Sequence, residues 1–381
     1  MKFKIPLSKP DLTKDDLKEI IKCFHSSWIS SRSPWVSRFE RLFARKVSET
    51  KYAIAVNSGT SALFLALKSL GIGKNDEVIL PAFTMIATIN AVIWVGANPV
   101  LVDCQSHNDW NLNINEIEKK ITKKTKAILP VHIYGFPSDM DRINKLARKH
   151  DLYVIEDAAE AMGSLYKSQL AGSLGDISCY SLYSNKIITT GNGGVVATNN
   201  RLFYKRIKKL SFFDINPKGH FLHHILGYNL VLSGLQAALG VSQIRRFEKL
   251  LSRRKKIYLW YLKYLKGKND VFFIKPQVFQ DPNYWFPPLL FKDPKKKMKI
   301  QTYLTKQGIE TRDFFRPLHL QPVYKTLFAH QTFPNSEYFY HRGLLLPSYT
   351  SLTEDLILKI CDNINRFKFE RNKKNNIFCK R

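Results

Sequence analysis

The stretch YAIAVNSGTSALFLALKSLG, residues 52–71, decides the fold class. Its first five residues form an apolar, β-like run, and from Thr60 onward the apolar residues recur at helical spacing. The same alternation continues as far as Asp157. The further strand-like runs are Glu77–Leu80, Pro99–Asp103, Ala127–Ile133 and Leu152–Asp157, and the further helical runs are Asp11–Phe24, Ile86–Trp94 and Asp139–Lys149. Strands separated by helices of this length pair in parallel, so we predict an α/β layer fold.

Two features of the remaining chain divide it into domains. Between Asp176 and Thr198, two strand-like runs are joined by the Gly-rich link TTGNGG with no helix between them. Beyond Gly234, a long helical pattern leads into a region where helices and short strands alternate. A chain of 381 residues is also longer than one compact core usually organises. We therefore expect a large α/β domain over residues 1–250 and a small C-terminal domain over residues 251–381.

Composition indicates a soluble globular protein. Hydrophobic residues make up 44% and charged residues 24% of the chain, which argues against a disordered or fibrous protein. The longest apolar stretch, residues 91–102, is too short to span a bilayer. The start MKFKIPLSKP lacks the apolar core of a secretory signal. We expect a cytoplasmic protein.

The charge balance is strongly basic. The net charge of +29, from 60 Lys and Arg against 31 Asp and Glu, would attract nucleic acid, anionic lipid or phosphorylated substrates. Local basic runs lie at Lys295–Lys297 and in residues 371–381, but neither is interleaved with an aromatic platform, and no nucleic-acid-binding motif is apparent. The sequence favours a basic surface that recruits anionic substrates or docks near a membrane.

Five widely spaced cysteines form no Cys-x-x-Cys pair. An odd set of this kind fits neither a disulfide framework nor a zinc site. We expect reduced, mostly buried thiols and no metal.

Three segments carry residues suited to chemistry, and each also has a structural interpretation. NSGTSAL, residues 57–63, joins a strand to a helix, where free N–H groups favour a phosphate, although Ser and Thr also simply cap helices. VIEDAAEAMGS ends an apolar strand at Asp157, where parallel sheets bind ligands, although an acid there also caps a following helix. In SLYSNKIITTGNGG, Lys186 lies beside apolar residues that would lower its pKa, although most lysines are surface charges.

In this order and at these separations, the segments resemble the DegT/DnrJ/StrS family of sugar aminotransferases, a branch of the fold-type I pyridoxal-phosphate (PLP) enzymes. The resemblance covers nearly the whole chain, including GIGKNDEVILPAFT, HIYGFPSDMD, GYNLVLSGLQAALG and GIETRDFFRPLH. It implies a large domain with a mostly parallel seven-stranded sheet flanked by helices, and a smaller C-terminal α+β domain. The segment NKIITTGNGG is most similar to 4-keto-6-deoxy sugar aminotransferases of the GDP-perosamine synthase type.

The resemblance assigns roles to the residues that match the family's motifs. Lys186 would form the Schiff base with PLP and move the proton between substrate and cofactor, and Asp157 would bind the protonated pyridine nitrogen. Glu160 would lie near the ring hydroxyl. The groups that would hold the phosphate are Ser181 and the backbone amides of Gly59 and Thr60.

Further residues would contact the cofactor or the substrate. Met85 replaces the family's aromatic residue over the cofactor ring; it can pack there but cannot π-stack. Asn229 of GYN would reach the phosphate of the neighbouring subunit, which implies a homodimer with shared active sites, or it is an ordinary turn residue. Arg312 and His319 are candidate contacts to the sugar or its diphosphate, or else structural residues.

The resemblance implies transfer of an amino group, with glutamate as the donor, to a nucleotide-linked 4-keto-6-deoxy sugar for O-antigen or other surface polysaccharide biosynthesis. Alternatives are amination at C3 or of a UDP- or dTDP-linked sugar, a sugar 3-dehydratase, and a non-catalytic regulatory or nucleic-acid-binding protein. Lys186 argues against the dehydratase, which carries His at that position. The charge of +29, Met85, and Val231 in place of a basic residue suggest the non-catalytic alternative. Asn192, in place of Glu, is a further departure.

Overall fold

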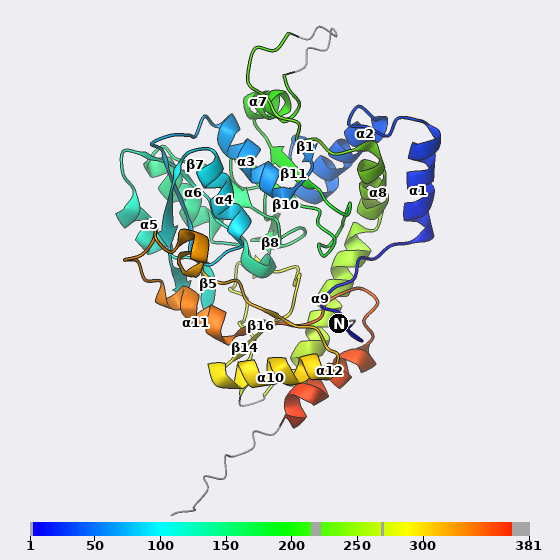
Figure 1. Ribbon diagram of the computed structural model, residues 1–381, viewed down its shortest axis with the longest axis vertical. Helices are drawn as coiled ribbons and strands as arrows, with labels where there is room; N and C mark the ends of the chain where they lie inside the picture. The colour runs from blue at the N-terminus through cyan, green and yellow to red at the C-terminus, as the bar shows by residue number, and fades with distance from the viewer. Residues whose placement is uncertain (1–2, 215–221, 268–269, 368–381) are drawn as a thin grey trace, which may run out of the picture.

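A computed structural model describes residues 3–214, 222–267 and 270–367 (Figure 1). Seven strands form its central sheet in the order β1-β11-β10-β7-β6-β2-β3. The pairs from β10 through β3 are parallel, and β11 runs antiparallel to both of its neighbours. The strands are β1 Tyr52–Val56, β2 Glu77–Pro81, β3 Asn98–Val102, β6 Thr125–Ile128, β7 Tyr153–Asp157, β10 Ile177–Ser181 and β11 Gly194–Thr198. The prediction of a mostly parallel seven-stranded sheet is confirmed.

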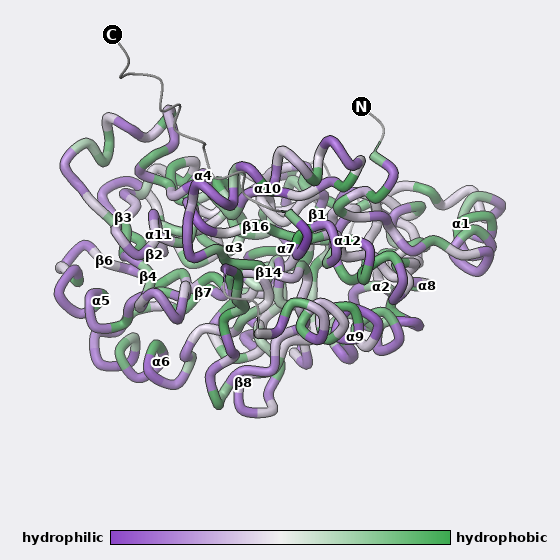
Figure 2. Tube along the Cα trace, turned by 90° about the horizontal axis from the view of Figure 1, so that it is seen from below, coloured by the Kyte–Doolittle hydropathy of each residue, from purple (hydrophilic) through white to green (hydrophobic). Residues whose placement is uncertain are grey.

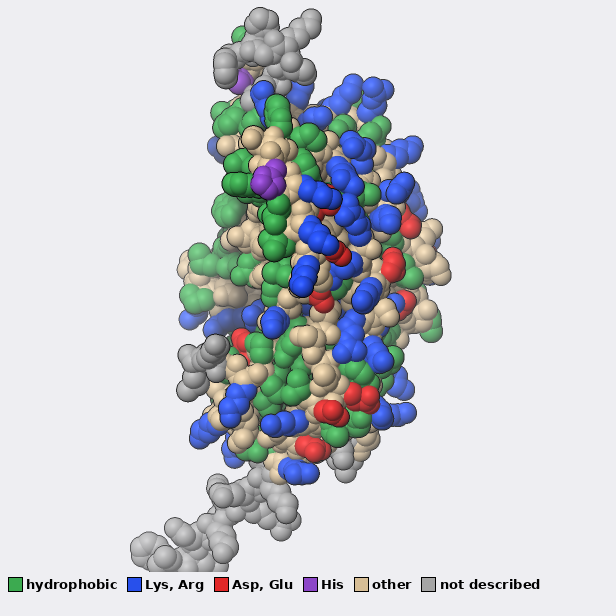
Figure 3. Space-filling model, turned by 90° about the vertical axis from the view of Figure 1, so that its right-hand side faces the viewer, with side chains coloured by type: hydrophobic (Ala, Val, Ile, Leu, Met, Phe, Trp, Pro, Cys, Tyr) green, Lys and Arg blue, Asp and Glu red, His purple; other side chains and the backbone are tan. Residues whose placement is uncertain are grey.

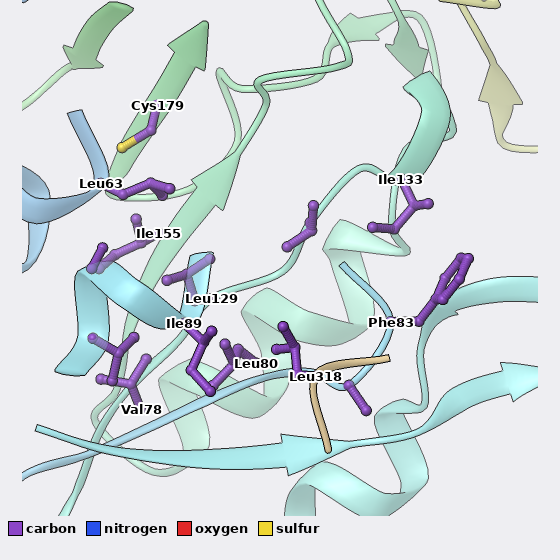
Figure 4. Packing of buried hydrophobic residues seen from close by; sticks show 14 of the residues in the cluster. Leu63, Val78, Leu80, Phe83, Ile89, Leu129, Ile133, Ile155, Cys179 and Leu318 are labelled. Carbon is purple, nitrogen blue, oxygen red and sulfur yellow. The ribbon is translucent and has the colours of Figure 1, made fainter. Parts of the chain in front are cut away.

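Helices cover both faces of this sheet because its strands are apolar on both sides. In β1, Ile54 and Val56 join the core under α3 and α4, whereas Ala53 and Ala55 face α2 and α8. Figure 4 shows the first of these cores, where Leu63 of α3 and Ile89 of α4 lie among residues of the strands. The helices around the sheet are α1 Lys14–His25, α2 Pro34–Phe43, α3 Gly59–Ser69, α4 Ile86–Trp94, α5 Ile114–Lys120, α6 Met140–Lys149, α7 Arg201–Ser211 and α8 Gly234–Arg245.

A second, smaller sheet lies in the C-terminal part, shown in the lower half of Figure 1. Its order is β12-β14-β16-β15, all antiparallel. Its strands are β12 Val271–Phe272, β14 Pro288–Phe291, β15 Arg312–Asp313 and β16 Gly343–Leu345, and the helices of this part are α9 Phe247–Leu265, α10 Pro294–Lys306, α11 Pro334–Arg342 and α12 Glu354–Arg366. Figure 2 shows hydrophobic segments along the middle of the molecule and hydrophilic ones at the outer turns.

The long helix α9 connects the two parts. Leu250 and Leu251 pack in the core that contains α2 and α8, whereas Ile257 and Tyr261 pack in the C-terminal core. The expected domain boundary near residue 250 therefore falls within a helix, and the division itself stays a prediction. Ile5 also packs in the C-terminal core, since it bridges Ile309.

Several boundaries differ from the sequence-based prediction for local reasons. The first helix begins at Lys14, because the side chain of Thr13 caps it. The strand predicted to reach Ile133 ends at Ile128, two residues before Pro130, which has no N–H to donate to a ladder. The long helical pattern beyond Gly234 is two helices, separated at Arg246.

Short elements were not predicted from the sequence. They are β4 Cys104–Ser106, β5 Asp109–Leu112, β8 Leu165–Tyr166, β9 Gln169–Leu170 and β13 Gln280–Asp281, with a π-helix at Ala44–Ser48 and 3-10 turns at Ile133–Gly135, Leu318–Leu320 and Pro322–Tyr324. The four cysteines within the described residues are free and buried, as expected, and Cys379 lies outside those residues, as does the basic run 371–381. Among the described helices, none has the length and apolar character needed to cross a membrane.

Candidate active site

The candidate site lies at the end of the large sheet where the carboxyl ends of β1, β7 and β10 meet. Val56 at the end of β1 and Ser181 at the end of β10 are both in register with Gly194, and Asp157 at the end of β7 pairs with Cys179 of β10. The carboxyl ends of strands are where open α/β sheets bind their ligands. All three segments predicted to carry chemistry meet at this edge.

Lys186 follows β10 in the turn that precedes the Gly-rich link. Its Nζ lies 3.9 Å from Oε1 of Glu160 and 3.7 Å from the centre of the Trp285 ring. Burial lowers the pKa of Lys186, while Glu160 and Asp157 oppose that change. A buried amine of this kind is available as a nucleophile or base nearer to neutral pH than a surface lysine.

Asp157 is held in one orientation by two donors. Thr88 donates from its hydroxyl to Oδ2 across 2.9 Å, and the backbone N–H of Ala159 donates to Oδ1 across 3.2 Å. Burial raises the pKa of Asp157, and the Thr88 hydrogen bond and the Ala159 N–H favour the carboxylate form. The carboxylate is therefore suited to bind a cationic ring nitrogen.

Glu160 lies three residues after Asp157 in the sequence, and its Oε1 is 3.9 Å from Nζ of Lys186. Its Oε2 accepts a hydrogen bond of 2.8 Å from the backbone N–H of Tyr134, a residue with φ of 53°. Burial raises the pKa of Glu160 to about 7, against the effect of Lys186. Lys186 and Glu160 thus lie near each other as a buried amine and a buried carboxyl.

The start of α3 forms an anion cradle that fits the phosphate of PLP. A Cβ on Gly59 would lie 3.0 Å from Cβ of Ser181, so the helix start and the end of β10 approach closely, and a larger residue would require Ser181 to move by a few tenths of an ångström. Gly59 and Thr60 occupy the first turn, where helical N–H groups have no backbone acceptor within the helix. Together with the Ser181 hydroxyl, these N–H groups provide hydrogen-bond donors suited to a phosphate.

The other predicted site residues differ in how near they lie to Lys186. Arg312, exposed on β15, lies close enough that its charge lowers the pKa of Lys186 in addition to the larger effect of burial. His319 is buried, and its Nε2 lies 3.1 Å from Oε1 of Glu337. Among the described contacts, none joins His319 to the lysine. Met85 is 48% exposed at the start of α4, and Asn229 is exposed where the chain bridges Phe212.

The two remaining departures from the family's motifs, Val231 and Asn192, make backbone contacts. Val231 bridges Val56 at the end of β1. The backbone carbonyl of Asn192 accepts hydrogen bonds from the side chains of Thr190, across 2.7 Å, and Gln236, across 2.9 Å. Within the described residues, no group of three or more His, Cys, Asp or Glu side chains could hold a metal ion.

Sequence reasoning missed two residues of the site. Thr88 lies in the largely apolar helix IATINAVIW, whose only other polar residue is Asn90, and a threonine in such a setting is the sequence signal that could have identified it as a buried donor. Trp285 lies about a hundred positions beyond Lys186, and nothing in the local pattern links the two. Together with Lys186, Asp157 and Glu160, they form a buried site with an amine, two carboxyls and an aromatic ring, while Gly59, Thr60 and Ser181 offer donors for a phosphate at the same ends of the strands.

Comparison with known proteins gives concordant matches. The model of the DegT/DnrJ/EryC1/StrS aminotransferase family matches residues 10–365. The chain is 38% identical to the GDP-perosamine synthase of Escherichia coli O157:H7 over 96% of this chain and 99% of that one. It is 34% identical to the GDP-perosamine synthase of Vibrio cholerae over 95% and 99%. Among solved structures, Spr1654 of Streptococcus pneumoniae in its PLP form superposes with a TM-score of 0.89, at 28% identity over 94% and 97% of the two chains.

Proposed function

Since the chain belongs to the DegT/DnrJ/EryC1/StrS aminotransferase family and is a PLP-dependent sugar aminotransferase, we propose that it transfers an amino group from glutamate to C4 of a GDP-linked 4-keto-6-deoxy sugar. Its similarity to GDP-perosamine synthases supports the GDP-linked substrate. The product would be an amino sugar for O-antigen or another surface polysaccharide, which the similarity to a spore coat polysaccharide biosynthesis protein also supports.

The observation that carries the proposal is the convergence of Lys186, Asp157 and Glu160 at one edge of the sheet. PLP, when bound, supplies an aldehyde and an electron-withdrawing pyridinium ring. Asp157 would keep the ring nitrogen protonated, with a charge-assisted hydrogen bond of about 1.5–3 kcal/mol. The amine of Lys186 would carry the cofactor and then move a proton at the substrate carbon, and Glu160, 3.9 Å from that amine, would lie near the ring hydroxyl.

The remaining roles follow from position and charge. The N–H groups of Gly59 and Thr60 and the hydroxyl of Ser181 would bind the phosphate, and Met85 would pack against the ring. Arg312, exposed and near the lysine, would bind the diphosphate of the sugar nucleotide, since a guanidinium matches phosphate oxygens in geometry and charge. Lys and Arg side chains also far outnumber acidic ones on the face in Figure 3, a field that attracts anionic substrates.

The proposal includes a homodimer in the cytoplasm with shared active sites. Apolar side chains are exposed in the segment that precedes Asn229: Phe213, Leu222, Ile225 and Leu226, the last of them 85% exposed. Water contact with such a group is unfavourable, and a second copy would cover it. Asn229, exposed beside these residues, would then reach the cofactor phosphate of the partner.

A direct test uses the purified protein with PLP. With glutamate alone, the cofactor absorbance should change from the aldehyde-derived to the amine form; no change would exclude transamination from glutamate. Addition of GDP- or dTDP-linked 4-keto-6-deoxy sugars should then restore the first form and add an amino group to one of them, as read by mass. Amination of only the dTDP-linked sugar would contradict the GDP assignment.

The alternatives are less well supported. Amination at C3 or of a UDP-linked sugar remains an outcome of the same product analysis. A 3-dehydratase would carry His in place of Lys186. A non-catalytic nucleic-acid-binding protein would have no use for the buried Lys186, Asp157 and Glu160, and the comparisons do not favour it.

A further inference from the structure

The indole of Trp285 contacts Lys186 at two points. Its Nε1–H donates a hydrogen bond of 2.8 Å to the backbone carbonyl of Asn185, the residue before the lysine. Its ring face lies 3.7 Å from the lysine Nζ. Trp285 is only 4% exposed, so the ring has little freedom to move away. One side chain therefore fixes both the backbone beside Lys186 and the tip of its side chain.

The turn that carries Trp285 is also fixed to the segment that carries Glu160. Asn283, fully buried, donates from Nδ2 to the backbone carbonyls of Glu160, across 2.8 Å, and Met162, across 3.0 Å. Its Oδ1 accepts a hydrogen bond of 2.9 Å from the backbone N–H of Trp285. Between them, Tyr284 has a φ of 51°, a conformation that non-glycine residues rarely adopt unless their surroundings enforce it.

We propose that Trp285 is a positioning residue, which holds the free ammonium group of Lys186 beside Glu160 whenever the lysine is not covalently attached to the cofactor. This inference rests on the proposed role of Lys186 as the cofactor lysine. The face of an indole ring carries negative charge density and attracts a cation, most strongly where water is excluded. The amine held there is 3.9 Å from Oε1 of Glu160, so the ammonium and the carboxyl stay beside each other between chemical steps.

The contact between the Trp285 ring and the Lys186 amine should change the protonation of the lysine in a way that packing alone would not. The ring favours the ammonium over the neutral amine, and its removal should therefore lower the pKa of Lys186. Loss of packing alone would expose Lys186 to more water and, because burial lowers the pKa of this lysine, would raise the pH at which it becomes reactive.

The experiment uses full-length, cofactor-free protein without substrate. Brief treatment with an amine-reactive reagent across a pH series, followed by mass spectrometry of the peptide containing Lys186, gives the labelling midpoint. For Trp285→Leu the midpoint should move to lower pH, with labelling of Lys186 about tenfold faster below the wild-type midpoint. Trp260→Leu is the matched control, because that ring contacts Arg253 and Lys256 instead and its loss should leave the midpoint unchanged.

A second variant keeps the test decisive if Trp285→Leu does not fold. Difluorotryptophan at position 285 retains the shape and the Nε1–H but weakens the negative ring face, so the midpoint should move in the same direction by less. A midpoint at or above the wild-type value in the difluorotryptophan protein, or in folded Trp285→Leu, would overturn the inference.

A separate experiment tests the proposed role of Lys186 as the cofactor lysine. Borohydride reduction of the PLP-loaded protein followed by peptide mapping should place the cofactor on Lys186. An adduct on another lysine would refute the proposed role of Lys186, whereas an adduct on Lys186 with unchanged labelling midpoints would refute only the role of Trp285.

Discussion

The hydroxyl of Thr88 donates a hydrogen bond to Oδ2 of Asp157 across 2.9 Å, and both residues are buried. Burial raises the pKa of this carboxyl, which by itself would favour the protonated form. The hydrogen bond opposes that tendency, since it stabilises the charged carboxylate that a pyridinium nitrogen requires. Thr88, a residue of α4 outside the motifs quoted above, thus favours the carboxylate form of the acid proposed to bind the cofactor.

Replacement of Thr88 by Val should weaken PLP binding. Valine preserves the shape but removes the donor, so the pKa of Asp157 rises further and the carboxylate binds the ring nitrogen less well. The dissociation constant of PLP, from absorbance titration, should increase about tenfold or more, as expected for a hydrogen bond to a charged group. Thr88→Ser retains the hydroxyl and should bind PLP nearly as the wild type does; equal affinity of the Val and Ser variants would contradict this role.

Glu40 on α2 should make stability depend on pH. Its Oε1 accepts a hydrogen bond of 3.0 Å from the backbone N–H of Ala55, and burial raises the pKa of Glu40 from 4.5 to about 7. A carboxyl whose pKa is higher in the folded chain favours folding when protonated. Its contribution is therefore fully present below about pH 4.5, is lost as the pH rises to about 7, and stays lost above that value.

The variant Glu40→Gln keeps an acceptor for Ala55 and carries no charge. In denaturant unfolding of cofactor-free protein, it should exceed the wild type by about 1–3 kcal/mol above pH 7, with the difference vanishing near pH 4.5. Glu248, exposed on α9, provides the control, since Glu248→Gln should leave the pH profile unchanged. A constant difference between Glu40→Gln and wild type at all pH values would show that Glu40 does not titrate in this range.

The architecture and most of the site could be predicted because their signals are local. β1 and α3 lie within twenty residues of each other along the chain. Gly59, Asp157 and Lys186 each belong to a short contiguous motif, and the order of these motifs indicates the chemistry. Thr88 and Trp285 could not be predicted, because each acts on a residue that only the folded chain brings near. Short strands such as β8, with two residues, carry no usable hydrophobic period.

Arg312 and His319, predicted together as substrate contacts, should respond differently to substitution. Arg312 is exposed near Lys186, so Arg312→Gln should raise the KM for the keto sugar nucleotide about tenfold or more while the half-reaction with glutamate continues. His319 is buried against Glu337, so His319→Ala should lower the free energy of unfolding by about 1–3 kcal/mol with little change in that KM. A KM effect confined to His319→Ala would reverse the two assignments.

Asn229 provides a test of shared active sites that needs no structure of the assembly. If each site combines Lys186 of one chain with Asn229 of the other, then Lys186→Gln and Asn229→Ala proteins should each be nearly inactive alone. When the two variants are co-expressed, they form heterodimers in which one of the two sites has both native residues. About a quarter of the wild-type activity, averaged over all sites, should therefore return. A Leu226→Lys substitution in both chains should reduce this recovery, since it places a charge on the exposed apolar segment proposed to lie in the interface. Sedimentation of each protein reports the oligomeric state independently, so a dimer without recovered activity would separate the assembly from the sharing of its sites.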